Sequence, residues 1–159
     1  FFEDHFSHEQ LEKHFDFYEP FTVHESSLSP CVHSIQAAVL GRMEQAYTFY
    51  LRTSRLDLDD YNKEVKEGLH ITSMAGTWMS VVEGMAGVRV HESGLEINPT
   101  IPEAWQSYTF RILYQTIPLE VSIDKNNVSV KNLGGQSISC RIMNESVQIA
   151  SGEEFIAKI

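Results

Sequence analysis

The sequence predicts an α + β chain in two parts, in which helices precede a set of short strands. Up to about residue 85, apolar residues recur three and four positions apart, as in Met43, Ala46, Tyr47, Tyr50 and Leu51. Beyond Gly87 the spacing changes to two, as in Tyr108, Phe110, Ile112 and Tyr114. The change of period places a domain boundary near residue 90 and divides the chain into 1–90 and 91–159.

Four helices are expected in the first part. Ser7 and Gln10 have the spacing of a capping box, and Glu19-Pro20 is typical of a helix end. Ser29 is the predicted N-cap of the second helix, with Pro30 in its first position, and Gly41 is its predicted end. The third helix carries the apolar run that begins at Met43. The fourth carries an apolar face made of Trp78, Val81, Val82 and Met85.

The second part predicts a small antiparallel β-sandwich. Apolar residues alternate with polar ones in several short segments that are separated by turn residues. Asn126-Asn127 predicts a hairpin turn between two such segments, and the stretch from Asn144 to Ser146 predicts another. Short strands with turns between them are typical of antiparallel neighbours.

Composition excludes several classes of function. The formal net charge is −10, which argues against a surface for nucleic acid or anionic membranes. No apolar run approaches the roughly 18 residues of a membrane span, and the first residues do not resemble a secretory signal. The cysteines, Cys31 and Cys140, lack metal-ligand spacing and are typical of a reducing cytoplasm. The sequence begins with Phe1 rather than Met, so we expect a fragment or a processed product.

Two polar junctions stand before predicted helices. Thr22 to Pro30 reads TVHESSLSP and holds His24, Ser26, Ser27 and Ser29. Hydroxyls and backbone N–H groups at a helix start can bind an anion, but serines also cap helices, and spacing alone favours the cap. Gly68 to Gly76 reads GLHITSMAG and repeats this chemistry with His70, Thr72 and Ser73. Two such helix starts could converge on one anion, with a protonated His70 adding charge.

A run of acidic residues, Asp57 to Asp60, resembles the start of an EF-hand loop. The resemblance fails because the sixth loop position holds Asn62 and the twelfth holds Gly68, where glycine and glutamate are needed. We therefore expect a solvated helix end there and no metal site.

Several motifs resemble those of glycoside hydrolase family 65, which contains maltose, trehalose and kojibiose phosphorylases. They are YEPFTVHESSLS at 18–29, YLRTSRLDLDD at 50–60, GLHITSMAGTW at 68–78 and, less specifically, GLEINP at 94–99. The resemblance covers essentially the whole chain. It implies the last helices of an (α/α)6 barrel followed by a C-terminal β-sandwich domain. It also implies phosphorolysis of an α-glucoside such as maltose, with inversion, to β-glucose 1-phosphate and glucose.

The resemblance assigns phosphate binding to Ser26, Ser27 and His70, with His24, Ser73 and Gly76 as possible neighbours. It places the general acid, a glutamate, upstream of Phe1, so no catalytic residue is expected here and Glu19, Glu25 and Glu67 are not candidates. The implied partners are the upstream part of the same enzyme, a disaccharide and phosphate, with a homodimer possible. No cofactor is expected beyond phosphate as co-substrate, and the isolated fragment should be inactive.

Two other functions stay open at this point. The chain could be a non-catalytic carbohydrate-binding or interaction module, or part of a family 65 hydrolase that cleaves trehalose-like disaccharides with water. The serine pair and His70 favour phosphate over water as the acceptor. If the two junctions pointed apart in the structure, the phosphate site would be excluded.

Overall fold

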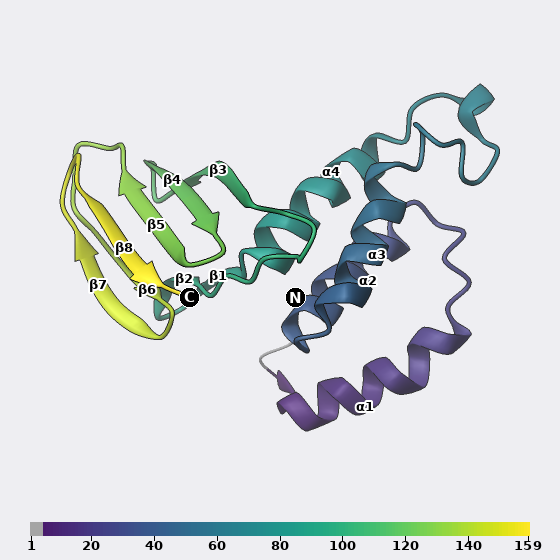
Figure 1. Ribbon diagram of the computed structural model, residues 1–159, viewed down its shortest axis with the longest axis horizontal. Coiled ribbons are helices and arrows are strands. Elements are labelled where there is room, and N and C mark those ends of the chain that lie inside the picture. The colour runs from purple at the N-terminus through teal and green to yellow at the C-terminus, as the bar shows by residue number, and fades with distance from the viewer. Residues whose placement is uncertain (1–4) are drawn as a thin grey trace. The chain divides into compact units, whose positions relative to one another are not determined.

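The computed structural model describes residues 5–159, in which helices precede strands as the sequence predicts (Figure 1). The chain separates into two units, Phe1–Gly84 and Met85–Ile159. Within the described residues, the first unit contains four α-helices with short turns between them, and the second contains eight strands.

Helix α1, His8–Tyr18, begins at the predicted capping box. The Gln10 N–H donates to the Ser7 hydroxyl at 3.3 Å, and the Ser7 N–H donates to the Gln10 side chain at 2.9 Å. Phe15 is buried whereas Tyr18 is 63% exposed, so the helix contributes Phe15 but not Tyr18 to the core. The 3-10 turn η2, Glu19–Phe21, contains Pro20 and follows the helix.

Helices α2, Ser29–Val39, and α3, Met43–Ser54, pack as a helical hairpin. Gly41 has φ +72°, a left-handed conformation that suits glycine and ends α2 where the sequence predicts. The Ser34 hydroxyl donates to the Ala46 carbonyl at 2.8 Å between the two helices. The core of this unit consists of Phe15, Ala37, Ala38, Ala46 and Phe49.

The predicted N-cap of α2 is wrong by one residue. Leu28 occupies the cap position without a side-chain bond, and Ser29 is the first residue of the helix. The Ser29 hydroxyl lies 2.9 Å from Nδ1 of His24. It forms a hydrogen bond with the imidazole in place of the bond that a capping hydroxyl makes with the helix backbone. Ser26 satisfies two backbone donors of this turn, with its hydroxyl 3.3 Å from the Leu28 nitrogen and its carbonyl 3.3 Å from the Ser29 nitrogen.

The predicted fourth helix changes its hydrogen-bonding pattern before it ends. The α-helix α4 spans Ile71–Met79, and the π-helical turn η4 spans Ser80–Met85. The buried Ser80 hydroxyl donates to the Gly76 carbonyl at 2.9 Å and so competes with the backbone at the transition. Val82 and Met85 are buried as the pattern predicts, whereas Trp78 is half exposed.

The second unit is a sandwich of two four-stranded sheets, with orders β1-β2-β6-β7 and β3-β4-β5-β8. Every pairing is antiparallel except that of β2 with β6, which is parallel. Buried residues of both sheets, among them Ile97, Val121 and Ile142, form one core cluster. The strands are β1 Val88–His91, β2 Gly94–Ile97, β3 Ser107–Tyr114, β4 Ile117–Asp124, β5 Asn127–Asn132, β6 Ile138–Ile142, β7 Glu145–Ile149 and β8 Glu154–Lys158.

Local turn chemistry sets the register of the β4–β5 hairpin. The Asp124 carboxylate accepts the backbone N–H groups of Asn126 at 2.7 Å and Asn127 at 2.9 Å, which closes a turn at residues 125–126, one residue before the predicted Asn126-Asn127. Ile123 then pairs with Val128 across the hairpin, and both side chains are buried. The alternating residues of β3 also pack against the core as predicted.

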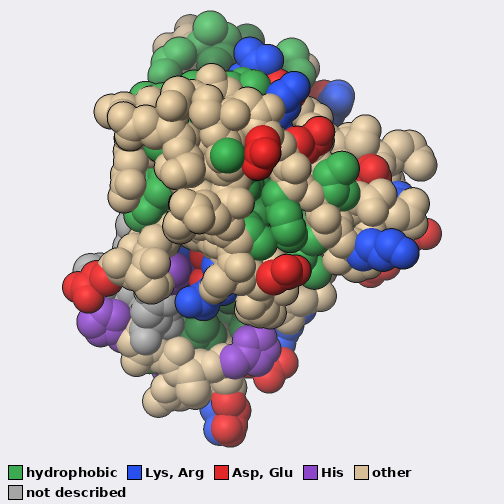
Figure 2. All heavy atoms as spheres, turned by 90° about the vertical axis from the view of Figure 1, so that its left-hand side faces the viewer, with side chains coloured by type: hydrophobic (Ala, Val, Ile, Leu, Met, Phe, Trp, Pro, Cys, Tyr) green, Lys and Arg blue, Asp and Glu red, His purple; other side chains and the backbone are tan. Residues whose placement is uncertain are grey.

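The face of the molecule in Figure 2 carries acidic and basic side chains side by side rather than one sign alone. This mixture, together with the net charge of −10, offers no support for binding of a nucleic-acid backbone on that face. Within residues 5–159, no helix is both long and apolar enough to cross a membrane.

Candidate functional site

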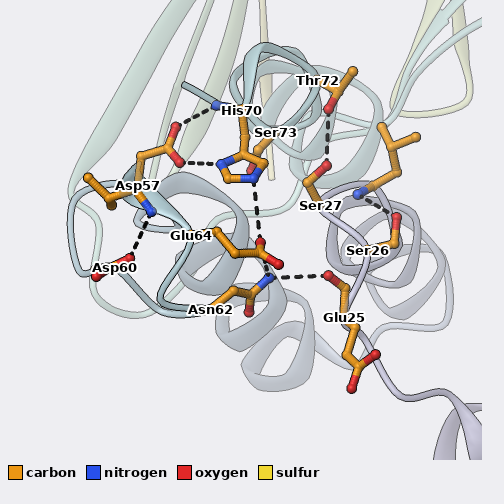
Figure 3. A network of polar contacts seen from close by, with 12 residues as sticks. Glu25, Ser26, Ser27, Asp57, Asp60, Asn62, Glu64, His70, Thr72 and Ser73 are labelled. Carbon is orange, nitrogen blue, oxygen red and sulfur yellow. Dashed lines mark hydrogen bonds and ion pairs between the residues drawn. The ribbon is translucent and has the colours of Figure 1, made fainter. Parts of the chain in front are cut away.

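The two polar junctions of the helical unit lie against each other. The Ser27 hydroxyl, which precedes α2, is 3.1 Å from the Thr72 hydroxyl in the first turn of α4 (Figure 3). A second contact joins the first junction to the connection that precedes α4, because the Asn62 side chain donates to the Glu25 carbonyl at 3.2 Å. The starts of α2 and α4 are therefore neighbours, which is the arrangement that a shared anion site needs.

Ser26 and Ser27 stand at the start of α2, with Ser26 exposed and Ser27 partly exposed. Helix N-termini carry partial positive charge and favour anions. Each hydroxyl also has a partner within the protein, the Leu28 N–H for Ser26 and Thr72 for Ser27. Ser26 accepts the hydrogen bond from Leu28 and keeps its own proton to donate to a phosphate oxygen. In the Ser27–Thr72 pair either hydroxyl can be the donor, so one of the two keeps a proton for the same purpose.

His70 lies at the start of α4, and its imidazole is the main ionisable group of the junction. Its Nδ1 lies 2.5 Å from one oxygen of the Asp57 carboxylate, and its Nε2 lies 3.5 Å from the Glu64 carboxylate (Figure 3). The hydrogen bond with Asp57 raises the pKa of His70 above its ordinary value, against the opposing effect of burial. The imidazole is thereby favoured in its charged form, in which both nitrogens donate.

His24 is placed beneath the first junction rather than at its surface. It is 8% exposed, and its ring contacts the rings of His33 and Phe49. Burial lowers the pKa of His24, and electrostatic interactions with His33 and Arg52 act in the same direction. Its φ of +55° and the 2.7 Å bond from Arg52 to its carbonyl hold the bend of the loop. Through these contacts His24 anchors the TVHESS segment to the helical unit.

Ser73 and Gly76 lie within the packing between helices. The Ser73 hydroxyl is buried and donates to the Thr53 carbonyl of α3 at 2.8 Å. A Cβ at Gly76 would lie 2.8 Å from both Cβ and Sγ of Cys31 in α2. The glycine therefore permits the close approach of α4 to α2, a packing role that requires no contact with phosphate.

We expect Gly76→Ala to destabilise the helical unit by about 1–2 kcal/mol, because overpacking outweighs the gain in helix propensity. The loss of stability would be measured by urea unfolding, monitored through hydrogen exchange of the α2 and α4 amides. Gly135→Ala, which adds a Cβ with nothing within 4 Å, serves as the control. An unchanged stability together with a raised KM for phosphate would instead indicate a role at the anion.

The network around His70 contains residues that sequence reasoning did not assign to the site. Asp57 was expected at a solvated helix end, yet its side chain is only 14% exposed and binds His70, 13 residues further along. Asn62 and Glu64, which lie 3.4 Å apart, come from the same connection and had no sequence signal. Asp59 does fit the expectation, because it forms an exposed ion pair with Arg55. Among residues 5–159, no group of three or more His, Cys, Asp or Glu side chains could hold a metal ion.

Comparison with known proteins places both units in one class of carbohydrate-active enzymes. Residues 1–79 match the glycosyl hydrolase family 65 central catalytic domain, and residues 88–149 match the glycosyl hydrolase family 65 C-terminal domain. The structure resembles a putative kojibiose phosphorylase from human microbiome with a TM-score of 0.92 at 35% identity. That match covers 99% of this chain and 21% of the other. The chain belongs to glycosyl hydrolase family 65.

Relatives within the family are phosphorylases by name. Identity is 44% to maltose phosphorylase of Bacillus subtilis (strain 168), over 92% of this chain and 19% of that protein. It is 42% to alpha,alpha-trehalose phosphorylase of Geobacillus stearothermophilus, over 87% and 18%. It is 33% to kojibiose phosphorylase of Halothermothrix orenii (strain H 168 / OCM 544 / DSM 9562), over 95% and 20%. The chain thus spans about a fifth of the length of these curated relatives.

Proposed function

We propose that this chain is the C-terminal part of an inverting disaccharide phosphorylase and that Ser26, Ser27 and His70 bind its phosphate. The observation that carries the proposal is the contact between the Ser27 and Thr72 hydroxyls, which places the start of α2 beside the start of α4, where His70 stands with a raised pKa. Hydroxyl donors, helix N-termini and a cation are the groups that phosphate oxygens bind in proteins.

In this proposal, the helices within the predicted residues 1–90 complete an (α/α)6 catalytic barrel, and the predicted residues 91–159 form its C-terminal β-sandwich domain. The first strand of that sandwich, β1, begins at Val88, before the predicted boundary. The general acid belongs to the upstream part of the same enzyme. An inverting hydrolase needs a second carboxylate to activate water, but phosphate is already an anionic nucleophile, so donors that hold it on the opposite face of the sugar suffice. The chain's role is to present that nucleophile.

The substrate class is an α-glucosidic disaccharide such as maltose, and the products are β-glucose 1-phosphate and a sugar. Identities of 44% to a maltose phosphorylase and 42% to a trehalose phosphorylase support the class. The buried free thiols of Cys31 and Cys140 support a cytoplasmic location, and a homodimer remains a prediction from the resemblance.

The proposal is tested with Ser26→Ala and Ser27→Ala in the full-length protein that carries this chain. A hydrogen bond to a charged group contributes about 1.5–3 kcal/mol, so each change should raise the KM for phosphate by roughly 10- to 150-fold. The KM for the disaccharide should change much less. Ser137→Ala, at an exposed position of the β-sandwich, is the matched control.

Two results would overturn the assignment. Equal increases in both KM values would mean that the serines support the fold rather than the phosphate. Turnover of the disaccharide in phosphate-free buffer at the full rate would identify a hydrolase instead.

A further inference from the structure

Asp57 makes two contacts with His70 through a single carboxylate. One oxygen lies 2.5 Å from the ring nitrogen Nδ1, and the other accepts the backbone N–H of His70 at 2.9 Å. One contact therefore orients the ring, while the other fixes the backbone at the residue that precedes α4. The Asp57 side chain is 14% exposed, so the carboxylate is held by its surroundings as well.

This geometry determines which ring nitrogen is available to a ligand. A carboxylate accepts but does not donate, so Nδ1 carries the proton that Asp57 accepts. Nε2 points away from Asp57 and toward Glu64, whose nearest oxygen is 3.5 Å away (Figure 3). That distance is longer than an ordinary hydrogen bond, and the Glu64 side chain is 42% exposed. The two carboxylates thus differ, one bound tightly behind the ring and one loosely in front of it.

The charges around the ring favour a second proton. Asp57, Glu64 and Glu67 all act to keep the imidazole charged, with the Asp57 hydrogen bond as the largest contribution. The hydrogen bonds that Asp57 accepts from the His70 side chain and backbone in turn lower the pKa of Asp57. Asp60 faces elsewhere and accepts the backbone N–H of Val65 at 3.1 Å. From the α2 side, Glu25 presents its carbonyl to Asn62 and its side chain is exposed.

Resting on the proposed function, we infer that Asp57 is a positioning residue that aims the Nε2–H of a doubly protonated His70 at phosphate, and that Glu64 occupies this N–H until phosphate displaces it. Asp57 does not touch the substrate. Glu64 acts as an internal anion that competes with the co-substrate for one donor. The two acidic residues, both in contact with the same ring, therefore have opposite effects on phosphate affinity.

The experiment compares Asp57→Asn with Glu64→Gln in the full-length protein, with KM for phosphate measured from pH 5.5 to 8.5. Asp57→Asn should raise this KM about tenfold at pH 7, and the rise of KM with pH should begin at lower pH than in the unmodified protein. Glu64→Gln should lower the KM two- to fivefold at pH 6, since a neutral amide competes less well. Asp59→Asn removes the same charge from the same run but contacts Arg55, so it should leave the KM unchanged.

Each variant, Asp57→Asn and Glu64→Gln, removes one negative charge near the imidazole. If the effect were only electrostatic, the KM for phosphate would shift in the same direction in both. A raised KM for Glu64→Gln, or an unchanged KM for Asp57→Asn while His70→Asn raises it, would overturn the inference and leave the phosphate site standing. If the KM for phosphate were unchanged in Asp57→Asn, Glu64→Gln and His70→Asn and also in both serine variants, the phosphate site itself would be overturned. Because Glu64→Gln is expected to gain affinity, that arm of the test cannot be mimicked by a variant that folds poorly.

Discussion

His70→Asn should raise the KM for phosphate about 10- to 100-fold, whereas His70→Gln should retain part of the affinity. The asparagine amide can occupy the position of Nδ1 and still donate to Asp57, but it leaves nothing at Nε2. The longer glutamine places its amide nitrogen near Nε2 and keeps a neutral donor there. Initial rates against phosphate, at saturating disaccharide, measure the difference between the two variants.

The pH dependence gives this prediction a second readout. If His70 binds phosphate as proposed, its raised pKa predicts that phosphate binding is strongest below that pKa and weakens as pH rises through it. In His70→Asn this dependence on the imidazole should disappear. His8→Gln, on the exposed start of α1, is the control and should keep both the KM and the pH profile. If His70→Asn and His70→Gln lost affinity equally and kept the pH profile, the imidazole would not be the group that binds phosphate.

The same pair also links pH to stability, and the sign follows from the two shifts. Asp57 has a lowered pKa, so its contribution is present above about pH 3.8 and is lost as pH falls further. His70 has a raised pKa, so its contribution is complete below about pH 6.5 and is lost as pH rises through the folded-state value. The pair therefore stabilises the helical unit most between these limits. Phosphate affinity and local stability should weaken together in alkaline solution.

Features that depend on a few neighbouring residues were predictable from the sequence. The capping box at Ser7 and the end of α2 at Gly41 formed as expected, and the hairpin turn after Asp124 formed one residue earlier than predicted, because each is a local hydrogen-bond pattern. The parallel pairing of β2 with β6 was not predictable, because it joins strands more than 40 residues apart. Alternation identifies a strand but not its partner.

The candidate site divides in the same way. Hydroxyls and histidines before α2 and α4 could be recognised from spacing, and the structure brings Ser27 and Thr72 together. The contact of Asp57 with His70 could not be recognised from spacing, because the two residues are distant in sequence and the acidic run around Asp57 is typical of a solvated segment. Ser29 was misread as a cap because the sequence does not reveal that His24 folds back onto its hydroxyl. Local spacing thus identifies the candidate donors but not the contacts that surround them.

The largest expected change in stability comes from Gly87→Ala, which should lower the free energy of unfolding of the β-sandwich by about 3 kcal/mol or more. Gly87 has φ +57°, where an L side chain costs about 1–2 kcal/mol. An added Cβ would also lie 2.3 Å from the Asn98 carbonyl oxygen, and backbone cannot move aside as a flexible side chain can. The Thr100 N–H, bound to the Met85 carbonyl at 2.7 Å, holds this crossing in place.

Hydrogen exchange of the β1 and β2 amides measures this effect within the unit concerned, since a chain with two units need not unfold in one step. Gly152→Ala separates the two causes, because Gly152 also has positive φ, +78°, but nothing lies within 4 Å of an added Cβ. It should lose only the backbone contribution, about 1–2 kcal/mol. Equal losses in the two variants would show that backbone conformation, rather than contact with Asn98, requires glycine at residue 87.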